Sequence, residues 1–512
     1  MRQINPHVLL DHAEEGAVRK DPGGRLRIAV IYPNSYAVGM SNLAIHALYG
    51  WFNARDDVVC ERAFLPDAYR PGQPVRTIES GTPLGDMDVL AFSLSFELDY
   101  PNLPRLMIAS GIPPFAADRQ APFVLAGGAA MSYNPEPVAP FLDAVVIGEI
   151  EPIFDALVPA LEMASRRGDV SALATLPGVY LPAHGALPIA RLVTPDLNLH
   201  PVATQIYTPH TEFGAMTLVE IGRGCPYGCK FCIASHAYHP ARWRSLETLL
   251  PVIVKGLSRR TRVGLLGASV TDHPQILRLC EEILARGGEP SPASMRAGAL
   301  TDDILALFAA GHVRTITLAP EAGSERLRRT VGKHLDDATL LSAVMRARRA
   351  GIGHLKLYTI IGLPGEQDDD VAAIPALALR IQRESGMRVS LGCSVFIPKP
   401  STPFAREAMI TETEARGKFA RIRRALQGHI EMTNESPRWA GWQAVLARGG
   451  RELASALFLL AHEADTPAVW RAAFRTAEIA PEAYLQAIPD GTPLAWAHIG
   501  GTRCSSVPQG RT

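Results

Sequence analysis

Short apolar runs that alternate with helical stretches are the feature of this sequence that most restricts its fold. Between residue 25 and about residue 160, the runs LRIAVIYP, DVLAFSLSF, PFVLAGGAA and DAVVIGEIE alternate with segments such as NLAIHALYGWFN. Continuous apolar runs are typical of strands buried on both faces of a parallel sheet, and crossover helices connect such strands. The sequence therefore predicts an α/β protein whose residues 1–160 form a doubly wound, Rossmann-like (flavodoxin-like) domain.

Small residues follow the predicted strands of this domain. In doubly wound sheets, ligands bind beyond the carboxyl ends of the strands. The residues that we predict as a ligand site at this edge are Gly39, Ser93, Ser95, Gly127, Gly128, Gly148 and Glu149. The alternative for each glycine and serine is a tight turn without any role in ligand binding.

A second alternating region begins at Met216. Its apolar runs are MTLVEIG, VGLLGAS, PASMRAG, TITLAPEAG, HLKLYTIIGLPGE and RVSLGCSVFIP, separated by helical patterns such as TDDILALFAAG and DDATLLSAVMRARRAG. Six strand and helix units predict a partial (β/α)6 barrel of the TIM type over residues 216–410, with its chemistry at the carboxyl ends of the strands. Residues 161–215 have the Pro-rich composition of a linker with short strands, and the pattern of residues 411–512 is mostly helical.

Three of the seven cysteines, Cys225, Cys229 and Cys232, lie in the segment GRGCPYGCKFC, directly after the first strand of the predicted barrel. Four sulfurs would close a tetrahedral zinc site or occupy every position of a four-iron cluster. Three thiolates can hold a four-iron cluster and leave one iron free to bind a substrate or a cofactor. The structural alternative is a zinc site whose fourth ligand is His236 or His239.

Composition restricts the partners of the chain. It carries 51 Lys and Arg against 51 Asp and Glu, so its formal net charge of +0 gives no global field that would attract nucleic acid or an anionic membrane. We interpret the basic run RGKFARIRRALQGH (416–429) as a solvated helix face. No run of 18 or more apolar residues and no secretory signal pattern is visible. Because the remaining four cysteines are scattered, we expect a cytoplasmic protein with reduced thiols and without membrane or nucleic-acid partners.

The spacing Cys-x3-Cys-x2-Cys, with the aromatic Phe231 before the last cysteine, resembles the radical S-adenosylmethionine (SAM) superfamily. The resemblance implies that the three cysteines bind a 4Fe-4S cluster and that the free iron binds the amino and carboxylate groups of SAM. It also implies reductive cleavage of SAM to methionine and a 5′-deoxyadenosyl radical, with an electron from a donor such as flavodoxin or ferredoxin. Such chemistry requires a closed barrel mouth, because solvent quenches a primary carbon radical.

Further segments match the places where the superfamily contacts SAM. The resemblance assigns LLGAS to the methionine amino group, although the usual Gly-Gly-Glu is missing there, Arg296 to the carboxylate, Glu321 to the ribose and IIGLPGE to the adenine. The full set of predicted SAM contacts is Phe231, Gly267, Ala268, Ser269, Arg296, Glu321, Lys356, Gly362 and Pro364. The alternatives are a solvated Arg296 and simple turn residues in IIGLPGE. The sequence nominates no catalytic acid or base, because hydrogen abstraction needs none.

The wider sequence resembles a little-characterised bacterial group of radical SAM proteins whose N-terminal domain is similar to cobalamin-binding domains. The segments that carry this resemblance are YPNSYAVGMSNLAIHALY, FSLSFELDYPNLPRLM, AGGAAMSYNPEPVAPFLDAVVIGEIEP, VFIPKPSTPF and RWAGWQAVLARGGRE. The resemblance implies that the strand-end residues named above contact cobalamin and that a methyl group is transferred to an unactivated carbon or phosphorus. The chain departs from many cobalamin proteins because it lacks Asp-x-His-x-x-Gly, whose histidine binds cobalt. Either cobalamin binds without that ligand, or the domain has kept its fold without the cofactor.

Four functions therefore compete. The first is a cobalamin-dependent methyltransferase, and the second is a radical SAM enzyme without cobalamin that rearranges, oxidises or forms a carbon–sulfur bond or ring. Methylthiolation of tRNA or a ribosomal protein is less favoured, because Cys60 is the sole cysteine in the N-terminal part where relatives with this activity carry a second cysteine set. A non-catalytic iron–sulfur or zinc protein would need a fourth protein ligand. The sequence does not specify the substrate.

Overall fold

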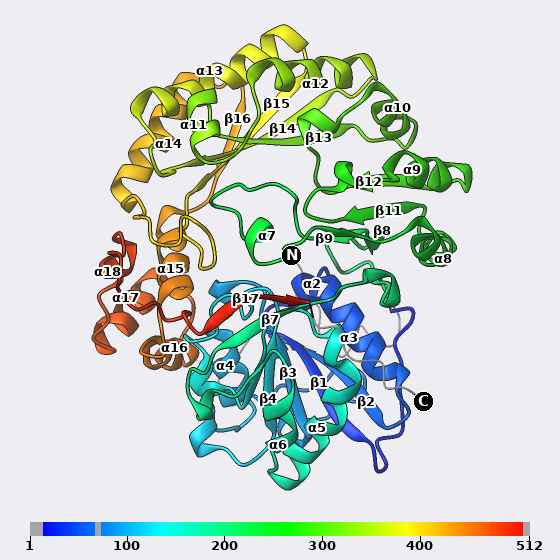
Figure 1. The fold of residues 1–512 in the computed structure, drawn as a ribbon, viewed down its shortest axis with the longest axis vertical. Helices are drawn as coiled ribbons and strands as arrows, with labels where there is room; N and C mark the ends of the chain where they lie inside the picture. Colours follow the sequence, from blue (N-terminus) through cyan, green and yellow to red (C-terminus); the bar gives the residue numbers. More distant parts are fainter. Residues whose placement is uncertain (1–13, 67–72, 505–512) are drawn as a thin grey trace.

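Two α/β units and a helical C-terminal region make up the computed structural model, which describes residues 14–66 and 73–504. The N-terminal unit and the barrel unit face each other, and the C-terminal helices lie along one side of the molecule (Figure 1). α7 (Ile233–His236), in the segment that contains the cysteines, lies between the two units (Figure 1).

The N-terminal unit contains a six-stranded sheet with the strand order β2-β1-β3-β4-β5-β6. Neighbouring strands from β2 through β5 pair in parallel, and β6 is antiparallel to β5. The order 2-1-3-4-5 is that of flavodoxin-like folds, which confirms the predicted fold class. The strands are β1 (Leu26–Tyr32), β2 (Val58–Phe64), β3 (Val89–Ser93), β4 (Phe123–Gly127), β5 (Ala144–Val146) and β6 (Val179–Tyr180), and the helices are α2 (Tyr36–Gly39), α3 (Leu43–Ala54), α4 (Asn102–Ala109), α5 (Phe154–Arg167) and α6 (Ser171–Thr175).

The sequence pattern does not predict β2, because Glu61 and Arg62 interrupt its apolar run. The structure explains how this strand is nevertheless buried. The guanidinium of Arg62 is fully buried and pairs with the carboxylates of Glu14 at 2.7 Å and Glu79 at 2.6 Å. A buried charge that is paired in this way can occupy a core position.

The second unit has seven parallel strands in two sheets within the described residues, ordered β12-β11-β8 and β13-β14-β15-β16. No strand pairing joins β12 to β13 in these sheets, so the barrel is partial, as predicted. The strands are β8 (Met216–Glu220), β11 (Arg262–Leu266), β12 (Glu289–Pro292), β13 (Thr315–Glu321), β14 (His354–Ile361), β15 (Arg388–Val395) and β16 (Glu431–Asn434). The outer helices are α8 (Leu246–Leu257), α9 (Ile276–Ala285), α10 (Asp302–Ala310), α11 (Glu325–Thr330), α12 (Asp337–Arg349) and α13 (Asp368–Ser385), and β9 (Gly222–Arg223) pairs with β10 (Arg242–Trp243).

The structure differs from the predicted barrel in the position of its third strand and in one further strand after residue 410. The third strand was expected in PASMRAG (292–298), but β12 ends at Pro292 and residues 297–299 form a 3-10 helix. β12 contains Pro290 and Pro292, which lack a backbone donor and suit a strand at the end of a sheet. The seventh strand, β16, lies in the region that was expected to be mostly helical.

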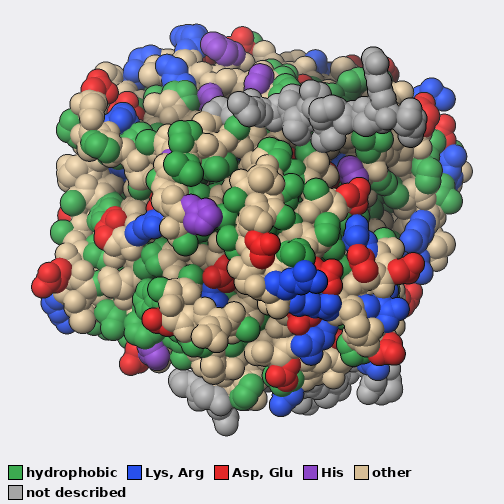
Figure 2. Space-filling view, turned by 60° about the horizontal axis from the view of Figure 1, so that its bottom comes forward, with side chains coloured by type: hydrophobic (Ala, Val, Ile, Leu, Met, Phe, Trp, Pro, Cys, Tyr) green, Lys and Arg blue, Asp and Glu red, His purple; other side chains and the backbone are tan. Residues whose placement is uncertain are grey.

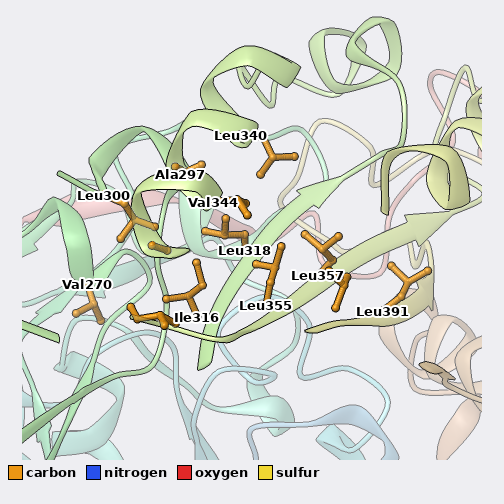
Figure 3. Close-up of a cluster of buried hydrophobic side chains, with 14 of the residues drawn as sticks. Val270, Ala297, Leu300, Ile316, Leu318, Leu340, Val344, Leu355, Leu357 and Leu391 are labelled. Atoms are coloured by element: carbon orange, nitrogen blue, oxygen red, sulfur yellow. The ribbon is translucent and has the colours of Figure 1, made fainter. Parts of the chain in front are cut away.

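The barrel core lies between the strands and the outer helices. Leu355 and Leu357 on β14 point toward the helical layer that contains Leu340 and Val344 of α12 (Figure 3). Because side chains alternate across a strand, Lys356, Tyr358 and Ile360 share the opposite face of β14. This face has partly or fully exposed side chains, while the other is buried throughout.

The C-terminal helices are α14 (Glu412–Leu426), α15 (Pro437–Arg448), α16 (Leu453–Ala461), α17 (Pro467–Thr476) and α18 (Pro481–Leu485). Of these helices, α16 and α17 pack on the N-terminal unit, α14 packs against α13 of the barrel, and α15 contacts both cores. Trp442 and Trp470 stack with ring centroids 5.0 Å apart, in the same core cluster as Phe92 of β3 and Leu457. β17 (Ile499–Cys504) pairs in parallel with β7 (Ile189–Val193), so the described end of the chain returns to the region between the two units.

The basic run 416–429 forms most of α14. Arg416 pairs with Glu412 at 2.6 Å, and Arg421 pairs with Asp368 at 2.8 Å. Positive and negative side chains are also interspersed on the face of the molecule in Figure 2. No helix within residues 14–66 and 73–504 is both long and apolar enough to cross a membrane.

We expect Leu457→Ala to destabilise the protein by about 2–5 kcal/mol, because it leaves a cavity in the core between α16 and the N-terminal sheet. Leu199→Ala is the matched control, since the Leu199 side chain is 72% exposed and its loss should change stability by less than about 0.5 kcal/mol. Denaturant unfolding followed by tryptophan fluorescence measures both, because Trp442 and Trp470 lie in the same cluster. Equal stability of the two variants would contradict this packing.

Candidate functional site

A cavity of about 440 Å³ lies between the N-terminal unit and the barrel. The carboxyl ends of β3, β4 and β5 line one side, and the ends of β8 and β11 line the other. The predicted residues around it are Ser93, Ser95, Gly127, Gly128, Gly148 and Glu149 from the N-terminal unit, and Gly267 and Ala268 from the barrel. Two sets of residues that the sequence assigned to different ligands therefore meet around one space.

Not every predicted strand-end residue faces this cavity. Gly39 does not line it, and a Cβ atom at this position would lie 2.4 Å from the ring of Phe64. Gly128 and Gly148 line the cavity but also have positive φ angles of 111° and 100°. An added Cβ would lie 2.6 Å from the carbonyl oxygen of Leu94 and 2.3 Å from that of Leu192, respectively. Close backbone packing thus accounts for these two glycines, whether or not a ligand is bound.

Arg223 connects the two units at the wall of the cavity. Its guanidinium lies 2.6 Å from Glu151, 2.8 Å from Glu220 and 3.4 Å from Glu149. Arg242 adds a contact of 2.7 Å to Glu149. Burial alone would raise the pKa of Glu149, but Arg242 and Arg223 hold it below its ordinary value. The predicted ligand residue Glu149 is therefore an ionised partner in the contact between the units.

The three predicted cluster cysteines follow this arginine on one loop. Cys229 is buried, and Cys225 and Cys232 are partly exposed. The Cys229 thiol donates to the carbonyl oxygen of Gly332 over 3.8 Å. Burial raises the pKa of all three thiols, that of Cys229 to about 11. Backbone N–H groups of Ala234 and Ser235 act in the opposite direction on Cys232 and favour its thiolate.

These residues suit a cluster better than a zinc ion. In a cubane cluster each thiolate binds a different iron atom, so the three sulfurs need not converge on one point. Within residues 14–66 and 73–504, no group of three or more His, Cys, Asp or Glu side chains is arranged to hold a single metal ion. The Nε2 atom of His236, the candidate fourth zinc ligand, lies 3.1 Å from the carbonyl oxygen of Cys229 and is engaged there.

The loop after β11 contacts the cysteine loop through Tyr227. The Tyr227 hydroxyl donates to the carboxylate of Asp272 over 2.8 Å, and the guanidinium of Arg296 lies 3.3 Å from the centre of the Tyr227 ring. Ser269 also donates to Asp272. The predicted SAM contacts Ser269 and Arg296 are thus brought beside the cysteine loop. Asp272, which the sequence reasoning missed, joins them.

A second ion pair lies on the other side of the cysteine loop. The Glu321 carboxylate, the predicted ribose contact, lies 3.3 Å from the ammonium group of Lys333. Burial raises the pKa of Glu321, while Lys333 opposes this change. Glu321 also has a positive φ of 68°, at a register shift between β13 and β14. Sequence reasoning missed Lys333, because no motif marks it.

The remaining predicted SAM contacts lie around the end of β14. Phe231 packs against a small cluster that contains Leu363, the residue between Gly362 and Pro364. Gly362 has a positive φ of 77°, and its N–H donates to the Glu366 carboxylate. Lys356 lies on the strand face away from the helical layer, 5.0 Å from the ring centre of Tyr358. Phe231 of the cysteine loop therefore lies near Gly362 and Pro364. Lys356 lies in the first half of β14, away from this end of the strand.

A buried acid lies at the switch point between β1 and β3. Asp99 is 4% exposed, and its carboxylate accepts a hydrogen bond of 2.7 Å from the side chain of Asn34, which follows β1. Burial raises the pKa of Asp99 to about 7, and the nearby carboxylate of Glu97 adds to this effect. Ligands of flavodoxin-like sheets bind at this switch point. With a pKa of about 7, the Asp99 carboxyl is present there in both its neutral and its ionised form near pH 7.

Comparison with known proteins agrees with the geometry. Residues 44–182 match the family described as "Radical SAM proteins, N-terminal", and residues 219–378 match the "Radical SAM superfamily". The chain is 30% identical over 436 residues to the uncharacterized protein MJ0966 of Methanocaldococcus jannaschii, covering 84% of this chain and 90% of that one. The chain belongs to the radical SAM superfamily and is a radical SAM enzyme.

Two further similarities concern parts of larger proteins. The chain is 26% identical over 288 residues to the anaerobic magnesium-protoporphyrin IX monomethyl ester cyclase of Cereibacter sphaeroides, over 52% of this chain and 45% of the cyclase. The solved structure of the cobalamin-dependent radical SAM enzyme OxsB, with aqua-cobalamin and SAM bound, matches with a TM-score of 0.51 and 17% identity. This match covers 69% of this chain and 52% of OxsB. At this identity the likeness to OxsB concerns the fold.

We expect Arg223→Met to lower the free energy of unfolding by about 3–5 kcal/mol, because the substitution leaves the buried Glu151 without its cation and removes a shared partner of Glu149 and Glu220. Arg262→Met is the matched control, since its pair with Glu289, at 3.3 Å, is exposed and contributes at most about 1 kcal/mol. Urea unfolding of both variants measures the difference. If Arg223→Met unfolds at the same urea concentration as Arg262→Met, the network does not hold the units together.

We expect Asp99→Asn to flatten the pH dependence of stability between about pH 4 and pH 8. Because the folded-state pKa of about 7 exceeds the ordinary value of 3.8, protonated Asp99 stabilises the fold fully below pH 3.8. This contribution, about 4 kcal/mol, is lost as the pH rises through 7. Unfolding at pH 5 and pH 8 should therefore show a larger loss for the wild-type protein than for the variant, with the exposed Asp86→Asn as control. Parallel losses in all three proteins would refute the assignment.

Proposed function

We propose that this radical SAM enzyme binds cobalamin in the cavity between its two α/β units and transfers a methyl group to an unactivated centre. The observation that carries the proposal is the shared cavity, which the ends of β3, β4 and β5 form together with the end of β11. A ligand there touches both the cobalamin-type edge of the first domain and the predicted SAM contacts Gly267 and Ala268. The likeness in fold to OxsB, whose structure has aqua-cobalamin and SAM bound, supports the proposal.

The lining of the cavity suits a flat macrocycle with a polar rim. Apolar side chains such as Leu43, Leu125 and Val146 offer surfaces for the ring, and the hydroxyls of Ser93 and Ser95 can bond to rim amides. No histidine is among the described residues that line the cavity. His46 is engaged elsewhere, because its Nε2 contacts the carbonyl oxygen of Met40 and its Nδ1 accepts from Gln205. Cobalamin would therefore bind without a histidine ligand on cobalt.

In this proposal each group of residues around the cavity has a separate role. Cys225, Cys229 and Cys232 hold the 4Fe-4S cluster, and the Tyr227–Asp272 and Lys230–Val331 hydrogen bonds orient their loop. The predicted SAM contacts position SAM next to the cluster, and the buried wall of Arg223, Glu149 and Glu151 helps to exclude water. When bound, the cluster and SAM supply radical chemistry and cobalamin supplies the methyl group. The electron comes from a separate donor, for which we propose a flavodoxin or a ferredoxin.

A second candidate is a radical SAM enzyme without cobalamin. The close packing of Gly128 and Gly148 favours it, because two of the strand-end glycines are required by the fold alone. In that case the cavity would hold the substrate itself, and the reaction would be an abstraction followed by rearrangement, oxidation or carbon–sulfur bond formation. Cobalt analysis separates the two candidates.

The test uses protein purified without air, reconstituted with iron and sulfide and then incubated with hydroxocobalamin. After desalting, we expect about four irons and one cobalt per chain. Ser95→Phe should fill part of the cavity from the N-terminal side and weaken cobalamin binding at least tenfold, while iron stays unchanged because Ser95 is not on the cysteine loop. Titration by ultraviolet–visible absorption measures the binding.

The control is Ser171→Phe, at an exposed position on α6, which should bind cobalamin as the wild-type protein does. Iron without cobalt in the wild-type protein would exclude the cobalamin proposal and favour the second candidate. Zinc without iron would exclude radical chemistry at Cys225, Cys229 and Cys232.

A further inference from the structure

We propose that Lys333 is the cation that sets the reduction potential of the cluster, with Glu321 as its counter-ion. The inference rests on the assignment of the cluster to Cys225, Cys229 and Cys232, and it is independent of cobalamin. Lys333 is a positioning residue in this proposal, because it acts through charge rather than by contact with the substrate.

The charge of the cluster itself affects its reduction potential. Reduction adds an electron to a site that already carries three thiolate charges, and net charge, hydrogen bonds and solvent exposure set the potential of such clusters. A nearby cation stabilises the reduced state more than the oxidised state. The effect is larger where water is scarce, because a low effective dielectric strengthens Coulomb interactions.

Lys333 lies in a segment that contacts the cysteine loop. Its backbone N–H donates to Arg328 at the end of α11, and the preceding residue, Gly332, accepts from the thiol of Cys229 over 3.8 Å. Lys230 in the cysteine loop donates its N–H to Val331 over 2.9 Å. Residues 331–333 are therefore bound directly to the cysteine loop, and Lys333 cannot move far from the sulfurs.

Gly332 shows how close these two segments are. It has a positive φ of 78°, and a Cβ atom at this position would lie 2.8 Å from the carbonyl oxygen of Gly228. Any other residue would push α11 away from the cysteine loop. Glycine at position 332 thus allows the approach that brings the Lys333 ammonium group near the cluster.

Arg296 is the other cation near the cysteine loop. Lys333 directly follows Gly332, the residue whose carbonyl oxygen lies 3.8 Å from the Cys229 sulfur, whereas Arg296 lies against the Tyr227 ring. The guanidinium of Arg296 is spread over the Tyr227 ring and lies 3.4 Å from Asp272. Lys333 is 22% exposed and its partner Glu321 is 15% exposed, so both charges lie in a partly dehydrated environment. Lys333 is therefore the cation whose own segment is bound to the cysteine loop, while the charge of Arg296 is held by Tyr227 and Asp272.

Glu321 carries the opposite charge to Lys333. Its removal should therefore shift the reduction potential of the cluster in the opposite direction, which gives a second, independent test. The Glu321 carboxylate lies 3.3 Å from the Lys333 ammonium group, so the two opposite charges partly cancel beside the cysteine loop. Removal of Lys333 leaves this carboxylate without its cation and should make reduction harder. Removal of the carboxylate charge should make reduction easier.

The test is a redox titration of the reconstituted full-length protein, monitored by electron paramagnetic resonance without SAM or cobalamin. Lys333→Met should lower the equilibrium constant for cluster reduction at least tenfold, about 59 mV for a one-electron couple. Glu321→Gln should shift the potential in the opposite direction, and Lys333→Arg should keep it near the wild-type value. Lys255→Met is the matched control, because Lys255 is exposed at the end of α8, away from the cysteine loop.

Iron is measured first in every variant. A wild-type protein without about four irons would refute the cluster assignment, whereas normal iron with an unchanged potential in Lys333→Met and Glu321→Gln would refute the role of Lys333 alone. If Lys333→Met loses its iron, Glu321→Gln still decides, since an unchanged or lowered potential there contradicts the electrostatic account. A tenfold loss in Lys333→Met that Lys333→Arg restores supports it.

Discussion

The contact of Arg223 with Glu149, Glu151 and Glu220 is the interaction on which the arrangement of the site depends. Arg223 lies two residues before Cys225, while Glu149 and Glu151 directly follow the last parallel strand of the N-terminal sheet. One guanidinium therefore joins the start of the cysteine loop to the edge of the other domain. Taking four charged groups out of water is expensive, and the geometry must be good for the network to form at all.

Facing sheet edges explain why a single cavity serves both units. Parallel strands place their carboxyl ends at one edge, where loops leave room for ligands, and both units of this protein have that arrangement. If the units were turned away from each other, each edge would open to solvent. Because they face each other, the ends of β3, β4 and β5 line the same cavity as the ends of β8 and β11. A reaction that solvent would quench can take place in such a space.

The sequence predicted the parts of the site that local pattern controls. Continuous apolar runs predicted β1, β3, β4 and β5, and the cysteine spacing predicted the loop after β8. The residues that depend on distant contacts were missed. β2 was not predicted because it contains Arg62, whose carboxylate partners lie elsewhere in the chain. The contact between Cys229 and Gly332 was also missed, because 103 positions separate the two residues. Gly39 shows that a glycine near a strand end can also be explained by packing, because a Cβ atom there would meet the ring of Phe64.

Two independent contacts hold the cysteine loop and fix its position relative to the neighbouring charges. Tyr227 ties one part of the loop to Asp272 after β11, and the Lys230 N–H, which donates to Val331 over 2.9 Å, ties another part to the end of α11. A loop held at one point could rotate and change the distance between its sulfurs and the neighbouring charges. A loop held at two points keeps both Arg296 and Lys333 at fixed places beside it. The contribution of these two protein charges to the field at the sulfurs is therefore set by the folded barrel.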